Sequence, residues 1–89
     1  GKARKTKITG AEAHRQLKQR RAQRQKQERL LAAVEAQVEA HENAISEIDA
    51  ALCQPDADYA ALSSQRAALE SALEAAMAQW EQLEEALSE

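Results

Sequence analysis

The sequence predicts an all-α protein, an antiparallel two-helix coiled-coil hairpin that follows a flexible basic N-terminal linker. The 89 residues include only two glycines and one proline, so few positions interrupt a helix. Hydrophobic residues make up 44% of the chain and are mostly Ala and Leu, a composition typical of long helices. They recur every three to four residues in two stretches, separated by one proline-containing segment.

Residues 1–10 are expected to form the flexible basic linker. This segment has four basic residues, shows no apolar periodicity and ends in glycine. Residues 11–89 are then one coiled-coil domain, which is all that a chain of this length supports. Because the first residue is Gly rather than Met, we expect the chain to be a piece of a longer protein.

The first helix is predicted over about residues 11–52, where nothing breaks a helix. Its apolar seam begins at Leu31, and positions before Leu31 become polar, so this end is expected to fray. The predicted seam is Leu31, Val34, Val38, His41, Ile45, Ile48 and Leu52.

The turn is predicted at about residues 53–58, and the second helix at about 59–88. Pro55 disfavours helix at Gln54, and Asp56 or Asp58 can cap the next helix. The second seam is Tyr59, Leu62, Arg66, Leu69, Leu73, Ala76, Trp80, Leu83 and Leu87.

Two seams joined by so short a turn are expected to fold back on each other. The polar seam residues His41 and Arg66 would fix the alignment, and Trp80 would supply the largest apolar surface. The register pairs Ile48 with Leu62, Val38 with Leu73, and Leu31 with Trp80.

Charge is strongly separated along the chain. Residues 1–29 contain eleven of the 12 lysines and arginines and carry a formal charge of +9, whereas residues 30–89 carry −12. A basic end on an acidic body indicates a polyanionic partner. The simpler alternative is that the basic residues form a solvated helix face that only keeps the protein soluble.

Helical angles divide the basic residues into two groups. One group lies on the seam side and is expected to pair with the acidic end of the second helix: Arg20, Arg21 and Arg24 with Glu81, Glu84, Glu85 and Glu89. The other group is left for a partner and forms the predicted nucleic-acid-binding site: Lys2, Arg4, Lys5, Lys7, Arg15, Lys18, Lys26 and Arg29.

Other chemistry has little support in the sequence. His14, His41 and Cys53 are too dispersed to share a metal ion, and we expect no cofactor. No nucleophile and base are paired and a hairpin offers no pocket, so we expect no enzymatic activity. One cysteine suits a reducing cytoplasm, and no apolar run is long enough for a membrane span.

Two segments resemble the C-terminal coiled-coil domain of ABC-F family ATPases. Residues 69–84, LESALEAAMAQWEQLE, are similar to the last helix of that domain, which closes on a Trp-Glu-x-Leu-Glu type ending. Residues 52–59, LCQPDADY, are similar to its acidic, proline-containing turn. The resemblance covers about residues 30–88, whereas the long Arg/Gln-rich helix before Leu30 departs from the pattern.

The resemblance implies a tail appended to two ATP-binding cassettes of a cytosolic bacterial protein that works on ribosomes. It also implies binding to DNA or ribosomal RNA, with the ATP sites outside this chain. We therefore expect a nucleic-acid-binding accessory module with little sequence specificity. The alternatives are a structural or protein-docking coiled coil and a homodimerisation module. Because the hairpin satisfies its own seam, we expect a single chain in isolation.

Overall fold

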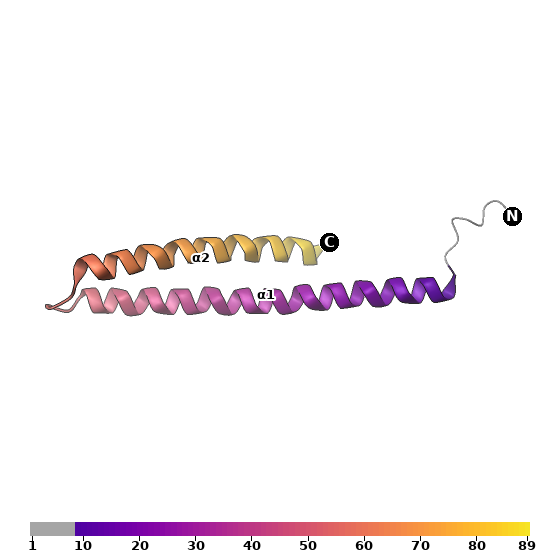
Figure 1. Ribbon diagram of the computed structural model, residues 1–89, viewed down its shortest axis with the longest axis horizontal. Coiled ribbons are helices and arrows are strands. Elements are labelled where there is room, and N and C mark those ends of the chain that lie inside the picture. The colour runs from indigo at the N-terminus through magenta and orange to yellow at the C-terminus, as the bar shows by residue number, and fades with distance from the viewer. Residues whose placement is uncertain (1–8) are drawn as a thin grey trace.

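The computed structural model describes residues 9–89, which form two α-helices. Helix α1 spans Gly10–Leu52 and helix α2 spans Tyr59–Ser88. The helices lie side by side and antiparallel, joined by a short loop at one end (Figure 1). The predicted fold class, an all-α helical hairpin, is confirmed. The flexible linker was expected over residues 1–10, and residues 1–8 of it lie outside the described residues.

Helix α1 begins at Gly10, within one residue of the expected start, because Thr9 caps it. The Thr9 hydroxyl accepts a hydrogen bond of 3.1 Å from the backbone N–H of Glu12 and donates one of 3.2 Å to the Glu12 carboxylate. Gly10, which was expected to end the linker, is the first residue of the helix. The bond from the Glu12 N–H to the Thr9 hydroxyl is the N-cap contact that stabilises a helix start, and a Glu three residues after a Thr is the sequence pattern of a capping box.

The loop closes one helix and opens the next with local hydrogen bonds. The backbone N–H of Cys53 bonds to Ala50 O at 3.2 Å, which ends α1. The Asp58 carboxylate accepts a hydrogen bond of 3.2 Å from the N–H of Ala61. Of the two aspartates expected to cap α2, Asp58 is therefore the one that does so.

The core follows the two predicted seams. Val34 and Ala76 are buried, with 1% and 5% of their surfaces exposed, and the other seam residues are half-buried with one exception. Tyr59 was assigned to the seam but is 73% exposed. Tyr59 is the first residue of α2. The seam ends there at the half-buried Leu52 and Ala57, so the ring of Tyr59 lies outside it.

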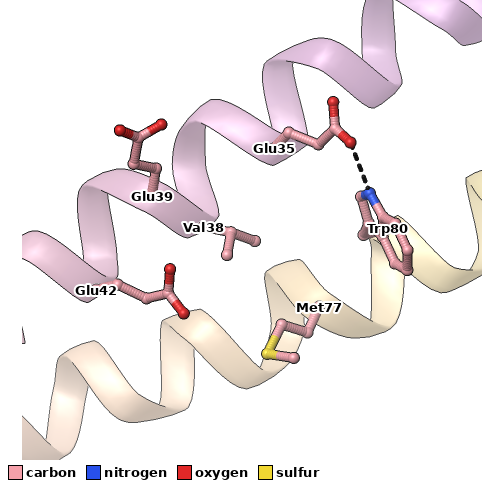
Figure 2. Close-up of a pocket in the computed structure, with 6 residues that line it drawn as sticks. All are labelled: Glu35, Val38, Glu39, Glu42, Met77 and Trp80. Carbon is pink, nitrogen blue, oxygen red and sulfur yellow. Dashed lines mark hydrogen bonds between the residues drawn. The ribbon is translucent and has the colours of Figure 1, made fainter.

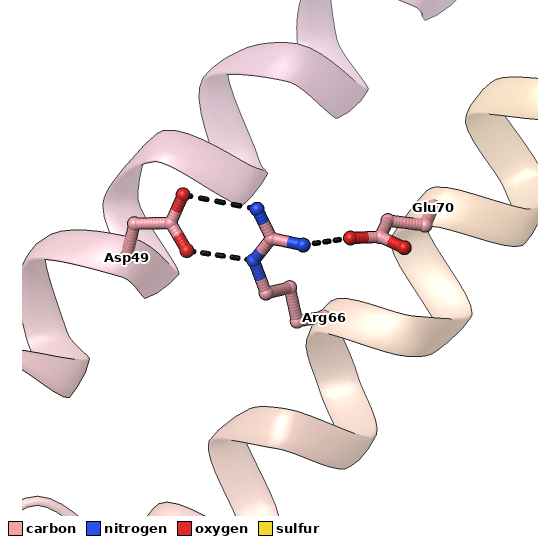
Figure 3. A network of polar contacts seen from close by, with 3 residues as sticks. All are labelled: Asp49, Arg66 and Glu70. Atoms are coloured by element: carbon pink, nitrogen blue, oxygen red, sulfur yellow. Dashed lines mark hydrogen bonds and ion pairs between the residues drawn. The ribbon is translucent and has the colours of Figure 1, made fainter.

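Arg66 holds the helices in register through a polar cluster (Figure 3). Its Nε and Nη2 donate to the two carboxylate oxygens of Asp49 at 2.6 and 3.1 Å, and its Nη1 pairs with Glu70 one turn along α2. Such a two-pronged contact fixes orientation as well as distance. It also explains how a charged residue is accommodated at a seam position. The guanidinium lies at the edge of the seam, where it is partly exposed and contacts Asp49 and Glu70.

The same cluster predicts an acid-sensitive component of stability. Hydrogen bonding to Arg66 lowers the pKa of Asp49 below its ordinary value of 3.8. The stabilisation by Asp49 is therefore complete above about pH 4 and is lost as the pH falls through the lowered folded-state pKa. Asp49→Asn is expected to unfold more easily than the unmodified chain at pH 7, and the difference should shrink below pH 4. Urea unfolding at several pH values measures this.

The matched control is Glu47→Gln, because Glu47 is exposed and forms no ion pair among residues 9–89. It should change stability little at any pH. If Asp49→Asn and Glu47→Gln had the same pH profile, the Arg66 contact would not contribute to stability.

The two helices differ in length, so α1 extends past the end of α2 (Figure 1). Helix α1 has 43 residues and α2 has 30, which corresponds to a difference of roughly 20 Å at 1.5 Å per residue. Near the end of α2, Arg24 Nη1 donates to the carbonyl oxygen of Leu87 at 3.2 Å. The last turn of α2 has no basic residue of its own, so Arg24 of α1 supplies a cation at that helix C-terminus.

Candidate functional site

The candidate site lies on residues 10–29 of α1, which we call the basic segment. It contains seven lysines and arginines and two glutamates, and every residue except Gln27 is exposed. Because α2 ends at Ser88, the first part of this segment has no helix beside it in the hairpin. A long, regular helix thus presents the cations of its first turns beyond the packed part of the molecule.

The structure describes four of the eight residues that were predicted to bind nucleic acid. Arg15, Lys18, Lys26 and Arg29 are all exposed, and among residues 9–89 none of them forms an ion pair. The other four, Lys2, Arg4, Lys5 and Lys7, lie outside the described residues.

These four cations share one side of α1, which we call the basic stripe. At 100° per residue they fall within about 80° of one another and span about 21 Å along the axis. Residues on the seam side, such as Arg20 and Arg24, point the opposite way. A partner that touches the stripe therefore meets all four side chains at once.

The expected pairing between the seam-side arginines and the acidic end of α2 is wrong. Among residues 9–89, the only side-chain hydrogen bond of this group is that of Arg24 to the Leu87 carbonyl, and its only ion pair joins Arg24 to Glu28 of its own helix at 3.9 Å. Arg20 lies one turn beyond Arg24 and so beyond the end of α2. Glu81 and Glu85 each precede a seam leucine by two residues, which turns them about 160° away from it.

Polar rather than aromatic groups accompany these charges. A shallow depression of the basic segment is lined by Gln16, Gln19, Arg20 and Gln23. Trp80 is half-buried in the seam, and the exposed Tyr59 lies at the loop end, far from the basic segment. The described part of the segment therefore offers amides and cations but no ring on which a base could stack.

A second surface, which the sequence analysis missed, lies along one side of the seam (Figure 2). It is a groove of about 510 Å³ that we call the acidic groove. Trp80 Nε1 donates to Glu35 Oε2 at 3.1 Å, and Met77 stays 49% exposed. The 3–4 spacing of three glutamates beside the α1 seam was the available signal. The groove is lined by Glu35, Val38, Glu39, Glu42, Met77 and Trp80.

The described residues offer neither a metal site nor a membrane span. No group of three or more His, Cys, Asp or Glu side chains in residues 9–89 could hold a metal ion. Neither α1 nor α2 contains a stretch apolar enough, over the needed length, to cross a bilayer.

Comparison with known proteins gives one result. Residues 21–85 match the family model described as ABC transporter C-terminal domain. The match takes in the loop and nearly all of the paired parts of both helices, and it leaves out the first turns of the basic segment. No individual curated protein and no solved structure matches the chain.

Proposed function

Because this chain belongs to the ABC transporter C-terminal domain family, we propose that it is an accessory module of an ABC-type ATPase and that it binds nucleic acid. Binding uses the basic stripe of α1 and is directed at backbone phosphates. The ATP sites belong to other parts of the parent protein, and this module holds the nucleic acid without chemical conversion.

The observation that supports this proposal most is the lack of internal partners for the stripe. Arg15, Lys18, Lys26 and Arg29 make no ion pair with any described residue, and they are fixed on one side of a straight helix. Cations that are already paired give little to a new partner, whereas exposed ones can replace the counterions of a phosphate chain.

The same geometry favours weak sequence specificity. Phosphate contacts set position and affinity, and base contacts set specificity. The amides of Gln16, Gln19 and Gln23 can reach base edges, but the described segment has no stacking ring. DNA and ribosomal RNA are both suitable partners on these grounds.

The resemblance of residues 52–59 and 69–84 to ABC-F ATPases supports a more specific proposal. The parent is then a cytoplasmic ABC-F type ATPase that acts on ribosomes, and ribosomal RNA is the partner. The alternative of a protein-docking coiled coil is favoured by the acidic groove, whose charge is unsuited to nucleic acid.

A salt titration tests the proposal. Fluorescence anisotropy with a labelled RNA or DNA duplex should give a plot of log K against log salt with a slope of roughly −3 to −6, because each neutralised phosphate contributes about −0.9. Both a flat plot and the absence of binding at low salt would contradict phosphate binding.

A further inference from the structure

The acidic groove bears the chemistry of a docking site for a basic helix. Its floor is apolar, formed by Val38, Met77 and Trp80, and carboxylates line it. Glu39 and Glu42 form no ion pair among the described residues, and nearly half of Met77 is exposed. A basic segment with one exposed apolar side chain would complement both properties.

The chain itself carries such a segment. Leu17, at 42% exposure, lies between Arg20 and Arg21 on the helix surface, and neither arginine pairs with a described residue. Leu17, Arg21, Glu39 and Glu42 all fall within about 60° of one another around α1. One side of a single helix is thus positive at its start and negative further along.

A molecule cannot use this complementarity internally. Helix α1 is one unbroken helix (Figure 1), so the basic segment cannot fold back onto its own groove. A second copy placed antiparallel can use it twice. Each basic segment then meets the groove of the other copy about a two-fold axis near Leu30, the kind of self-complementary contact that closes a dimer.

We propose that the acidic groove receives the basic segment of a second copy in a weak, salt-sensitive antiparallel dimer. Arg21 lies opposite Glu39 of the other copy, and Arg20 lies near Glu42. The seam stays within each chain, so the hairpin is unchanged. This docking replaces the expectation of a single chain once the protein is concentrated.

The contact is weak because few apolar groups take part and the charges are exposed. We therefore expect a dissociation constant on the order of 0.1 mM, at the weak end of protein interfaces. Exposed charge pairs are screened over about 10 Å at 0.1 M salt, so the dimer dissociates as salt rises. The basic stripe, at about 130° from this side of α1, remains accessible in the dimer.

Sedimentation equilibrium of the full chain with charge-reversed variants tests the proposal. At low salt the mass should rise from one chain toward two as the concentration passes through about 0.1 mM, and 0.5 M salt should restore one chain. Arg20→Glu with Arg21→Glu reverses the segment, and Glu39→Lys with Glu42→Lys reverses the groove. Each double variant alone should dimerise at least about tenfold more weakly, because attraction becomes repulsion.

An equimolar mixture of the two double variants provides the decisive measurement. Each groove then meets a segment of opposite charge, so the mixture should recover the mass of two chains. Three results would each overturn the proposal: one chain at every concentration of the unmodified protein, dimerisation unaffected by the variants, or a mixture that stays monomeric. None of the four substituted residues belongs to the basic stripe, and the mass is measured without nucleic acid, so the dimer is tested separately from nucleic-acid binding.

Discussion

Replacing Val34 with aspartate is expected to abolish the cooperative unfolding transition of the hairpin. Val34 is 1% exposed and is the most completely buried large side chain among the described residues. A carboxylate there loses its hydration without gaining a partner, which costs at least about 3 kcal/mol. A core this small supplies only about 3–5 kcal/mol in total, so the substitution removes most of it. Thermal melting followed by circular dichroism measures the effect.

The neighbouring substitution Ala33→Asp is the matched control. Ala33 is exposed, so the new carboxylate remains hydrated and only the lower helix propensity of aspartate is felt, at most about 0.7 kcal/mol. The control should keep a cooperative melt at a slightly lower temperature. Equal destabilisation by the two variants would show that Val34 is not part of a packed core.

Removing the four charges of the basic stripe is expected to weaken nucleic-acid binding by roughly 10³-fold at about 0.1 M salt. The variant carries Arg15→Gln, Lys18→Gln, Lys26→Gln and Arg29→Gln. The slope of log K against log salt should become shallower by about 3.6, since four phosphate contacts are lost. Fluorescence anisotropy over a salt series gives both quantities.

Two double variants that each remove two positive charges distinguish the effect of the basic stripe from the effect of net charge. Arg15→Gln with Lys18→Gln removes half of the stripe, whereas Arg20→Gln with Arg24→Gln removes two cations from the opposite side of α1. The first should weaken binding more, because a straight helix turns only one side toward a phosphate chain. Circular dichroism of both checks that α1 stays helical. Equal losses would mean that affinity follows total charge and that the stripe is not the site.

Most of the fold could be predicted because two simple signals agree. Periodic apolar residues place the seam on each helix, and Pro55 with the capping Asp58 places the turn between them. The cross-helix contacts lie within about one turn of the predicted register: Trp80 was paired with Leu31 and in fact bonds to Glu35. Periodicity fixes which side of a helix is buried more firmly than it fixes the longitudinal offset.

The errors come from helix ends, where short-range contacts decide. Thr9 and Glu12 cap α1, so that Gly10, which was assigned to the end of the linker, is the first residue of the helix. Tyr59 has seam spacing but no seam beside it at the first position of its helix. The spacing of apolar residues alone does not show where the partner helix ends.

The charge pattern of the sequence was enough to locate the candidate site. The contacts that its side chains make could be predicted only in part. The exposure of Arg15 and Lys18 follows from their place in the first turns of α1, which have no helix beside them. The role of Arg24, which reaches the carbonyl of Leu87 rather than a carboxylate, depends on where α2 ends. The acidic groove depends on side chains from both helices, including Met77 and Trp80, and such a combination emerges only once the two are aligned.

Because α1 is one unbroken helix, the position of a residue in the sequence determines the direction in which its side chain points around the helix axis. No break separates the part of α1 that packs on α2 from the part that projects beyond it, so the two rotate as one body. Each residue added or removed between them would turn the projecting cations by about 100° relative to α2. A change of seven residues, close to two full turns, would leave the direction almost unchanged and alter only the reach, by roughly 10 Å. The hairpin therefore determines both how far from the loop its charges stand and the direction in which they face.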